Sequence, residues 1–431
     1  MTAEIRSDRV VVIGGGPAGI GAGIALGDRG TVLDGAPDLG GLCRTIELDG
    51  ALFDMGGHSF HTPHPGVRDL VFNSLEMYEQ QREARCHSHG VMIDYPFQAH
   101  FRQLPDPRVV GECAAGLDGA AGGEGAGNFE EFIEFRFGSG IARHFLRPYN
   151  RKLWRTDLSE LATDWVGERV AAPDSAGAMF ASSGGKRTPL QADTRVAYPA
   201  RGGYGEIYRA LGRRMSDLRL GRRVGGLDPA RRRLTLEGGE VILWSRVVST
   251  IPVDRLLALL PDVPPMLKRD VGGLRRLSLA LVLVVIDHPV DVPVQRIYSA
   301  DPAIPFHKLV INHNSSPSLR SRPRHGVLAE VSFSPEVPLP PGDLAGPVVG
   351  ALESMGLIWS ADEVHGVTVI HVPYAYPIPT HARDAVVRRA KDWLEERGVH
   401  TVGRFGEWAY INSDEAFSRG LELGRTLADL D

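Results

Sequence analysis

The run Val10-Val11-Val12-Ile13-Gly14-Gly15-Gly16-Pro17-Ala18-Gly19 decides the fold of this chain. Its four branched apolar residues predict a buried parallel strand, and the segment that begins at the proline predicts a helix. Gly14, Gly16 and Gly19 have the spacing of a turn that lets backbone approach a pyrophosphate at the positive N-terminus of a helix. Asp34 follows twenty residues after Gly14, where a carboxylate is expected to bind ribose hydroxyls. Strand, turn, helix and acid in this order predict a dinucleotide-binding site.

A second glycine-rich region indicates which dinucleotide binds. The segments Leu39-Gly40-Gly41-Leu42 and Gly56-Gly57-His58 follow Asp34 closely. FAD is longer than NAD, and its isoalloxazine ring must pass a second close approach of the backbone, which glycine permits because it has no Cβ atom. The alternative is a glycine-rich surface loop. No second GxGxxG motif in a strand context follows, so a built-in nicotinamide domain is not expected, and NAD(P)H would bind only transiently, as a reductant.

Length, charge and cysteine content exclude several classes of partner. The 431 residues are enough for two or three closely packed domains. The net charge of −5 gives no attraction to nucleic acid or to anionic membranes. The longest apolar run, Leu277 to Ile286, is about half the length of a bilayer span and predicts a buried strand. Three cysteines without metal-ligand spacing indicate a reducing, cytoplasmic environment. We therefore expect no nucleic acid, no membrane and no metal, and the oligomeric state stays open.

Four further segments carry a family resemblance. They are Tyr95-Pro96-Phe97-Gln98, the run RPYNRKLW from Arg147 to Trp154, the run WVGERVAAP from Trp165 to Pro173, and Gly403 to Tyr410. Together with the glycine motifs they resemble the UDP-galactopyranose mutases, the eukaryotic-type form more than the usual bacterial one. This family lies within the FAD-dependent flavoproteins related to amine oxidases and protoporphyrinogen oxidase. The resemblance extends to about Tyr410, and RPYNRKLW followed by WVGERVAAP at matching spacing is highly specific.

The resemblance implies an α/β fold in which a Rossmann-like FAD-binding domain joins a β-sheet substrate domain and a helical insertion. The expected parts are FAD-binding segments at 1–65, 196–270 and 381–431, a mostly helical insertion that binds uridine at 66–195, and a substrate-domain sheet at 271–380. The second FAD-binding segment contains strands that alternate with turns, and these correspond to a β-meander. Within the insertion, Gly111 to Asn128 is rich in glycine, alanine and acidic residues and predicts a mobile surface loop.

The expected cofactor site combines the two glycine regions with residues from later segments. We expect FAD to be held by Gly14, Gly16, Gly19, Asp34, Gly41, Leu42, Gly57, His58, Val224 and Arg404. The resemblance places the backbone near Val224 against the adenine and His58 beside the isoalloxazine ring. A histidine that only bonds loop backbone is the alternative interpretation of His58.

The expected substrate site has a uridine pocket and a diphosphate clamp. The resemblance assigns the uridine pocket to Tyr95, Phe97, Gln98, Phe145, Asn150 and Trp154. A uracil needs a stacking surface and amide-like partners, which aromatic, Asn and Gln side chains supply; ordinary core aromatics with polar neighbours are the alternative. The clamp corresponds to Arg169, Tyr376 and Tyr410, with Tyr298 and Lys308 near the sugar and phosphates. A guanidinium fork suits phosphate oxygens, and phenols add neutral donors.

The chain departs from the family pattern around the sugar. Lys308 stands where the family has a second diphosphate arginine, and lysine keeps the charge but loses the bidentate fork. Ser315 falls near a family tyrosine, and Asp193 near a family asparagine. The family's Gly-Asn-Gln stretch after Tyr410 is replaced here. The nucleotide pocket is therefore kept while the sugar surroundings change, which predicts a UDP-sugar other than the usual one.

The reaction that the resemblance implies is a non-redox interconversion of the pyranose and furanose forms of a UDP-sugar. In that family N5 of reduced FAD is the nucleophile, and we expect His58, Arg169 and Lys308 to be the catalytic side chains. One alternative is an FAD-dependent oxidoreductase of the amine oxidase or sugar dehydrogenase type, acting on a nucleotide sugar or another small molecule. Another is a non-catalytic protein that binds a UDP-sugar or a flavin.

Overall fold

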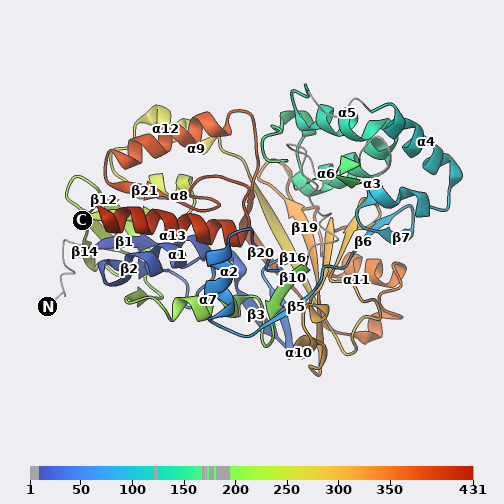
Figure 1. The fold of residues 1–431 in the computed structure, drawn as a ribbon, viewed down its shortest axis with the longest axis horizontal. Coiled ribbons are helices and arrows are strands. Elements are labelled where there is room, and N and C mark those ends of the chain that lie inside the picture. The colour runs from blue at the N-terminus through green and yellow to red at the C-terminus, as the bar shows by residue number, and fades with distance from the viewer. Residues whose placement is uncertain are drawn as a thin grey trace.

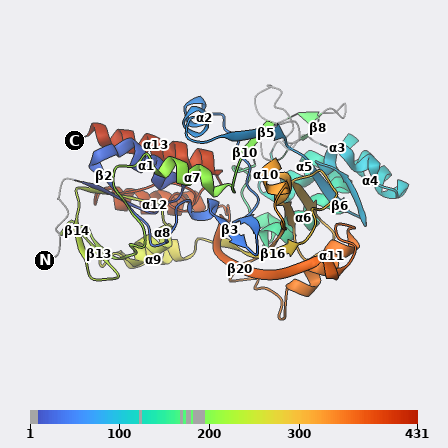
Figure 2. The same ribbon diagram turned by 90° about the horizontal axis from the view of Figure 1, so that it is seen from below.

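The computed structural model describes residues 9–120, 125–166, 170, 172–173, 179–180 and 195–430. Two halves lie side by side, and the first and last residues that the structure describes, 9 and 430, belong to the same half (Figure 1). That half contains a parallel sheet between layers of helices and strands. The other half is built on a larger sheet with helices over its edge and one face (Figures 1 and 2). This mixed arrangement confirms the predicted fold class.

A five-stranded parallel sheet forms the centre of the first half. In spatial order its strands are β11 (Leu218–Arg219), β2 (Gly30–Leu33), β1 (Val10–Ile13), β15 (Arg246–Ser249) and β21 (Val399–Thr401). Side chains alternate across β1, as strand geometry requires. Val10 and Val12 belong to the apolar core of one face, whereas Val11 and Ile13 belong to the core of the other. The run that predicts this strand is therefore buried on both sides.

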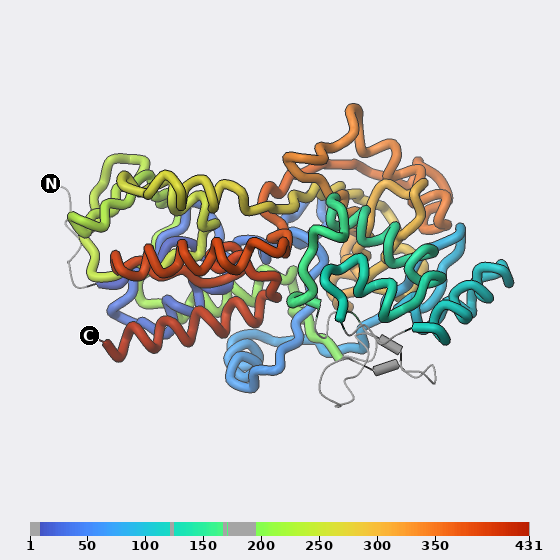
Figure 3. The backbone as a smooth tube through the Cα atoms, turned by 90° about the horizontal axis from the view of Figure 1, so that it is seen from above, coloured from blue at the N-terminus to red at the C-terminus, as the bar shows by residue number. Residues whose placement is uncertain are grey.

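Two layers cover the parallel sheet. One consists of helices α1 (Pro17–Leu26), α7 (Gly205–Gly212) and α13 (Ser413–Asp429). The other contains the three-stranded meander β12 (Val224–Asp228), β13 (Arg233–Leu236) and β14 (Val241–Leu243), and helices α8 (Val253–Ala258), α9 (Pro265–Gly272) and α12 (Arg383–Glu395). Figure 3, seen from above, shows the red C-terminal helix α13 running alongside the other helices of this half. Helix α13 packs closely on α1.

A seven-stranded sheet forms the second half. In spatial order its strands are β20 (Val364–Pro377), β16 (Arg276–Ile286), β19 (His325–Phe333), β18 (Lys308–Ile311), β17 (Arg296–Ser299), β6 (Ala84–Ser88) and β7 (Val91–Asp94). The apolar run at 277–286 is thus a buried strand, as predicted. Helix α11 (Ala345–Ser354) covers one face. The other face meets the hairpin of β3 (Thr45–Leu48) and β4 (Ala51–Asp54) from the nucleotide half. Strands β6 and β7 come from the segment predicted as a helical insertion.

Short elements complete the fold around this sheet. Strands β5 (Met77–Gln81) and β10 (Arg195–Pro199) pair with each other, as do β8 (Ala172–Pro173) and β9 (Met179–Phe180). The remaining helices are α2 (Pro65–Phe72), α3 (Phe97–His100), α4 (Pro107–Asp118), α5 (Phe129–Ile141), α6 (Arg147–Trp154) and α10 (Pro317–Arg320). A π-helical turn joins α5 to α6.

The predicted mobile loop from Gly111 to Asn128 is wrong in its first part, because α4 continues to Asp118. The Asp106 side chain caps this helix by accepting a hydrogen bond from the Arg108 backbone N–H. Gly116 of α4 lets the helix approach α5 closely, because a Cβ atom on Gly116 would lie 2.8 Å from the Gly140 backbone nitrogen. The small residues of α4 allow it to pack directly against α5. This segment therefore has the composition of a loop although it is a helix.

Neither a membrane-spanning helix nor a metal cluster is found in the described part of the chain. None of its helices has the length and apolarity needed to cross a bilayer. No group of three or more His, Cys, Asp or Glu side chains there is arranged to hold a metal ion. All three cysteines are buried thiols.

Candidate functional site

A cavity of about 1440 Å³ is lined by residues of both halves. Its walls include eighteen of the predicted site residues: Gly14, Gly16, Asp34, Gly41, Leu42, Gly57, His58, Tyr95, Phe97, Gln98, Phe145, Asn150, Trp154, Tyr298, Lys308, Tyr376, Arg404 and Tyr410. Gly19 instead packs against the Gly14 carbonyl, and Val224 begins β12 away from the walls. Arg169 and Asp193 lie outside the described residues. The roles of all these residues stay predictions.

The glycine turns form one end of the cavity. Gly16 precedes α1 and faces Gly41, so a Cβ atom on Gly16 would meet nothing nearer than the Gly41 Cα atom at 3.9 Å. The backbone therefore leaves open the space that a pyrophosphate needs at the helix N-terminus. The Asp34 carboxylate accepts hydrogen bonds from the backbone N–H groups of Gly15 and Ala36, at 2.5 and 2.6 Å. A carboxylate has acceptor capacity beyond two bonds, which leaves room for ribose hydroxyls. These residues fit FAD.

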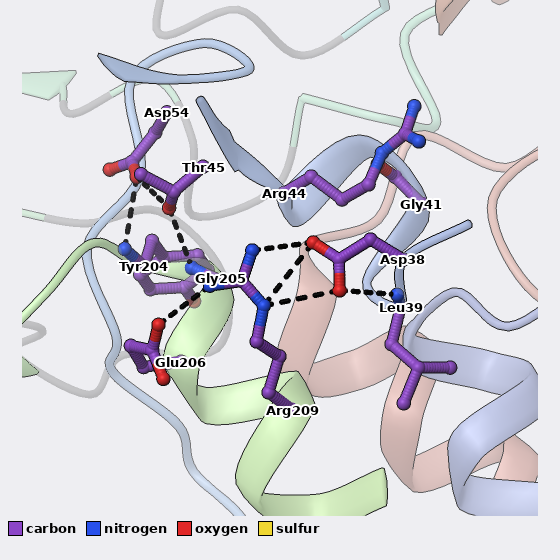
Figure 4. A network of polar contacts seen from close by, with 10 residues as sticks. All are labelled: Asp38, Leu39, Gly41, Arg44, Thr45, Asp54, Tyr204, Gly205, Glu206 and Arg209. Carbon is purple, nitrogen blue, oxygen red and sulfur yellow. Dashed lines mark hydrogen bonds and ion pairs between the residues drawn. The ribbon is translucent and has the colours of Figure 1, made fainter. Parts of the chain in front are cut away.

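A polar network fixes the loops around the glycine turns (Figure 4). Arg209 of α7 forms ion pairs with Asp38 and Glu206. Asp54, at the end of β4, accepts hydrogen bonds from the Thr45 hydroxyl and the Tyr204 backbone N–H, at 2.6 and 2.9 Å. Burial raises the pKa of the Asp54 carboxyl to about 6, in spite of these bonds. The network ties α7 to the segments on both sides of the second glycine region.

His58 lies against the ring of Tyr204, with centroids 4.9 Å apart and an interplanar angle of 13°. Burial, together with the nearby cations Arg404 and Lys308, lowers the pKa of His58 to about 3. Its imidazole is therefore neutral at physiological pH. The Nδ1 atom is buried and has no hydrogen-bond partner among the residues that the structure describes. A ligand or a water molecule in the cavity would supply such a partner.

Aromatic side chains line the other end of the cavity. Phe97 stacks on Phe145 with centroids 4.6 Å apart, and Trp154 contacts Tyr410 edge-on at 5.4 Å. Asn150 is buried here, and its amide nitrogen donates to the Leu146 carbonyl at 2.8 Å. Flat surfaces with amide groups beside them are what a pyrimidine base requires.

A buried ion pair lies between the two ends. The Lys308 ammonium is 2.8 Å from the carboxylate of Glu330, a residue with no exposed surface. The other Glu330 oxygen accepts the Gly57 backbone N–H at 2.8 Å. Burial alone would raise the pKa of Glu330, but Lys308 and His307 outweigh it and hold that pKa well below its ordinary value. Burial alone would lower the pKa of Lys308, but Glu330 raises it, so the pair is charged.

The sequence analysis did not predict three charged residues of this region, Arg82, Arg296 and Glu330. Arg82 donates a hydrogen bond to the Tyr298 hydroxyl at 2.7 Å, and both arginines line the cavity. A signal for Arg296 was present, because it lies two residues before Tyr298 on one strand and so shares its face. Glu330 lies on another strand, and only the register with Lys308 brings the two together.

Lys152 fixes the loop between β17 and β18 from outside the cavity. Its ammonium, with three N–H donors, lies within hydrogen-bonding distance of four backbone carbonyls, those of Ser299, Asp301, Ile304 and Phe306. Burial lowers its pKa to about 8, which keeps it mostly charged at pH 7. The two strands that carry Tyr298 and Lys308 are thus joined through one side chain of α6.

We expect Lys152→Met to lower the free energy of unfolding by about 2–3 kcal/mol, because it leaves buried carbonyls without donors. Urea unfolding measures this change. Lys391→Met removes an exposed lysine that only pairs with Glu395, and should cost less than about 0.5 kcal/mol. Equal effects of the two substitutions would show that the loop does not depend on Lys152.

Comparison with known proteins identifies the family. Residues 23–288 match the flavin-containing amine oxidoreductases. This chain belongs to that family. The match covers the second glycine region, the insertion and the long strand β16, so the FAD-binding fold is assigned independently of the resemblance noted above.

Individual relatives differ in what they do. The fold is similar to that of reduced UDP-galactopyranose mutase, with a TM-score of 0.91, 24% identity, and coverage of 99% of this chain and 95% of that one. It is also similar to putrescine oxidase, with a TM-score of 0.64, 15% identity, and coverage of 98% and 99%. A carotenoid 3,4-desaturase of Haloarcula japonica is 29% identical over 182 residues, which are 40% of this chain and 33% of the desaturase. The alignment thus spans about a third of that relative.

Proposed function

We propose that this chain is a flavin-dependent mutase that interconverts the pyranose and furanose forms of a UDP-sugar. The observation that carries the proposal is that one cavity has both a glycine-lined end that fits FAD and an aromatic end that fits a uracil. The ion pair of Lys308 and Glu330 lies between them. The high TM-score against a UDP-galactopyranose mutase supports the same arrangement.

Each part of the chain has a task in this reaction. Gly14, Gly16, Gly41 and Asp34 would hold FAD, which when bound and reduced supplies its N5 atom as the nucleophile toward the anomeric carbon. Loss of UDP from the sugar would leave negative charge on the diphosphate. Lys308, Tyr376 and Tyr410 line the cavity where donors and a cation would stabilise that charge. Arg169 is the further cation that the sequence motif suggests.

The neutral state of His58 limits its role. With a pKa of about 3 it does not act as a cationic acid at physiological pH. Its imidazole exchanges one hydrogen bond with a ligand, through the Nδ1 atom that lacks a protein partner among the described residues. We propose that His58 orients the reacting groups and leaves the stabilisation of charge to Lys308.

A second candidate is an FAD-dependent oxidoreductase. Two comparisons favour the oxidoreductase, because the aligned relative is named a desaturase and the family is named for amine oxidoreductases. It does not account for the aromatic end with its buried amides, or for a clamp suited to a diphosphate. For the mutase, a UDP-sugar is the proposed partner for the aromatic end, NAD(P)H the proposed reductant of the flavin, and the cytoplasm the proposed location.

Incubation with UDP-sugars tests the proposal. The flavin-loaded protein is reduced with dithionite and mixed with UDP-galactose and related UDP-sugars, and the products are separated and weighed by mass spectrometry. We expect a new UDP-sugar of unchanged mass, formed only by the reduced protein. A product that differs in mass by two hydrogens would support the oxidoreductase instead. Tight binding without any turnover would support a protein that only binds its ligand.

A further inference from the structure

Arg296 is a buried cation that forms no ion pair among the residues that the structure describes, although the charges of Glu330 and Asp54 act on it from a distance. Its residue is 5% exposed, yet it lines the cavity. No residue in the described ranges accepts a hydrogen bond from its guanidinium or forms an ion pair with it, whereas Lys308 has Glu330 and Arg82 has the Tyr298 hydroxyl. Burial of an unpaired charge is costly, so a site that keeps one is prepared for an anion.

The position of Arg296 indicates which anion. It lies on the same face of β17 as Tyr298 and opposite Val310 of β18. A Cβ atom on Gly57 would be 3.1 Å from the Arg296 Nε atom and 3.5 Å from the Lys308 Cε atom. Arg296 therefore lies against the loop that carries His58, which is expected to border the isoalloxazine ring.

The two diphosphates have other expected partners. The pyrophosphate of FAD is expected at the N-terminus of α1, between the two glycine turns. The diphosphate of UDP is expected beside Tyr376, Tyr410 and Lys308. What lies between the uridine diphosphate and the flavin ring is the sugar. A guanidinium at this point pairs most strongly with an anionic group, which a neutral hexose does not have.

We propose that the sugar of the substrate carries a carboxylate, so that the ligand is a UDP-uronic acid, and that Arg296 binds this carboxylate. The assignment rests on the proposed function, since it requires a UDP-sugar in the cavity. A guanidinium presents two parallel N–H donors to a carboxylate, and such charge-assisted bonds are stronger in a buried site than neutral ones. The altered residues around the sugar, Lys308 among them, agree with a changed sugar.

Ligand titration of the flavin-loaded protein tests this assignment. Dissociation constants are measured by calorimetry for UDP, UDP-galactose, UDP-glucose, UDP-galacturonate and UDP-glucuronate. We expect at least one uronate to bind about tenfold or more tightly than the hexose of the same configuration, as a gained charge-assisted contact predicts. In Arg296→Gln that preference should disappear, while the affinity for UDP changes less than about threefold.

Arg85→Gln is the matched control. Arg85 lies on the neighbouring strand β6, opposite Ile297, where it pairs with Asp94 and is 38% exposed outside the cavity. Its replacement removes the same charge and should keep the preference for the uronate. Flavin absorbance of each variant reports whether the cofactor end is intact.

Each remaining result has one meaning. If the native protein binds UDP but has equal affinities for UDP-uronates and UDP-hexoses, the role of Arg296 is overturned and the mutase proposal still stands. A loss of UDP affinity in Arg296→Gln equal to the loss of uronate affinity would overturn it too, by making Arg296 a diphosphate contact. Failure of the native protein to bind UDP at all would overturn the proposed function itself. If Arg296→Gln does not fold, the native comparison decides.

Discussion

Replacing Gly16 with alanine is expected to leave the chain folded and to remove most of its affinity for FAD. Gly16 has φ −81° and ψ −177°, a conformation open to any residue, and its added Cβ atom meets only Gly41 at 3.9 Å. The methyl group would instead occupy the space into which a pyrophosphate fits. We expect FAD to bind about 100-fold more weakly, the upper part of the range for forcing a methyl group into a close contact. Fluorescence titration of the apoprotein with FAD measures the change.

Two comparisons make the Gly16 result specific. Gly66→Ala in α2 adds a Cβ atom that has no neighbour within 4 Å, and it should leave both folding and FAD affinity unchanged. Gly14→Ala is a poor test, because Gly14 has φ +110° and a Cβ atom there would lie 2.2 Å from the Thr250 hydroxyl oxygen. If Gly16→Ala bound FAD as tightly as the parent, the pyrophosphate would not lie at this turn.

The cofactor end could be read from the sequence because its residues are close together in the chain. Strand, glycine turn and helix are consecutive, and their chemistry is a property of the backbone. Gly14, Gly16, Asp34 and Gly41 therefore line one cavity, and their contact with FAD stays a prediction. Val224 is an exception, since its position depends on how the meander packs and not on local sequence.

The substrate end could be read only through family resemblance. Phe97 comes from α3, Phe145 from the π-helical turn between α5 and α6, and Trp154 from α6, and no local pattern in the sequence predicts that they meet. The charges were harder still. Glu330 and Lys308 become partners through the register of β18 with β19, which no spacing in the sequence encodes. A buried carboxylate surrounded by cations is a property of the assembled sheet.

Amino-acid composition gave a wrong prediction for one segment, because its small residues serve helix packing and not flexibility. The glycine- and alanine-rich segment that begins at Gly111 has the composition of a linker. In the structure its first part is the helix α4, whose small residues lie against α5. The capping Asp106 and the proline that follows it are the local signals of a helix start. At this segment the capping residues indicate the structure correctly, whereas the glycine content does not.

Glu330→Gln is expected to lower the free energy of unfolding by about 3–5 kcal/mol, the usual cost of breaking a buried ion pair from one side. The amide oxygen can still accept the Gly57 N–H, but Lys308 loses its counter-ion in a region that also contains Arg296 and Arg82. Urea unfolding at pH 7 measures the difference. Combining Glu330→Gln with Lys308→Met removes both charges and should recover much of the loss, because a neutral pair carries no buried charge.

The pH dependence gives an independent check on the same pair. The folded-state pKa of Glu330 lies below its ordinary value of 4.5, so its contribution is fully present above pH 4.5 and is lost as the pH falls toward the folded-state pKa. The gap in stability between the native protein and Glu330→Gln should therefore narrow between pH 5 and pH 3. Glu79→Gln breaks an exposed pair with Arg68 and should cost less than about 1 kcal/mol at every pH. A Glu330→Gln variant as stable as Glu79→Gln would mean that Lys308 is not held by this carboxylate, and that its charge is balanced from within the ligand site instead.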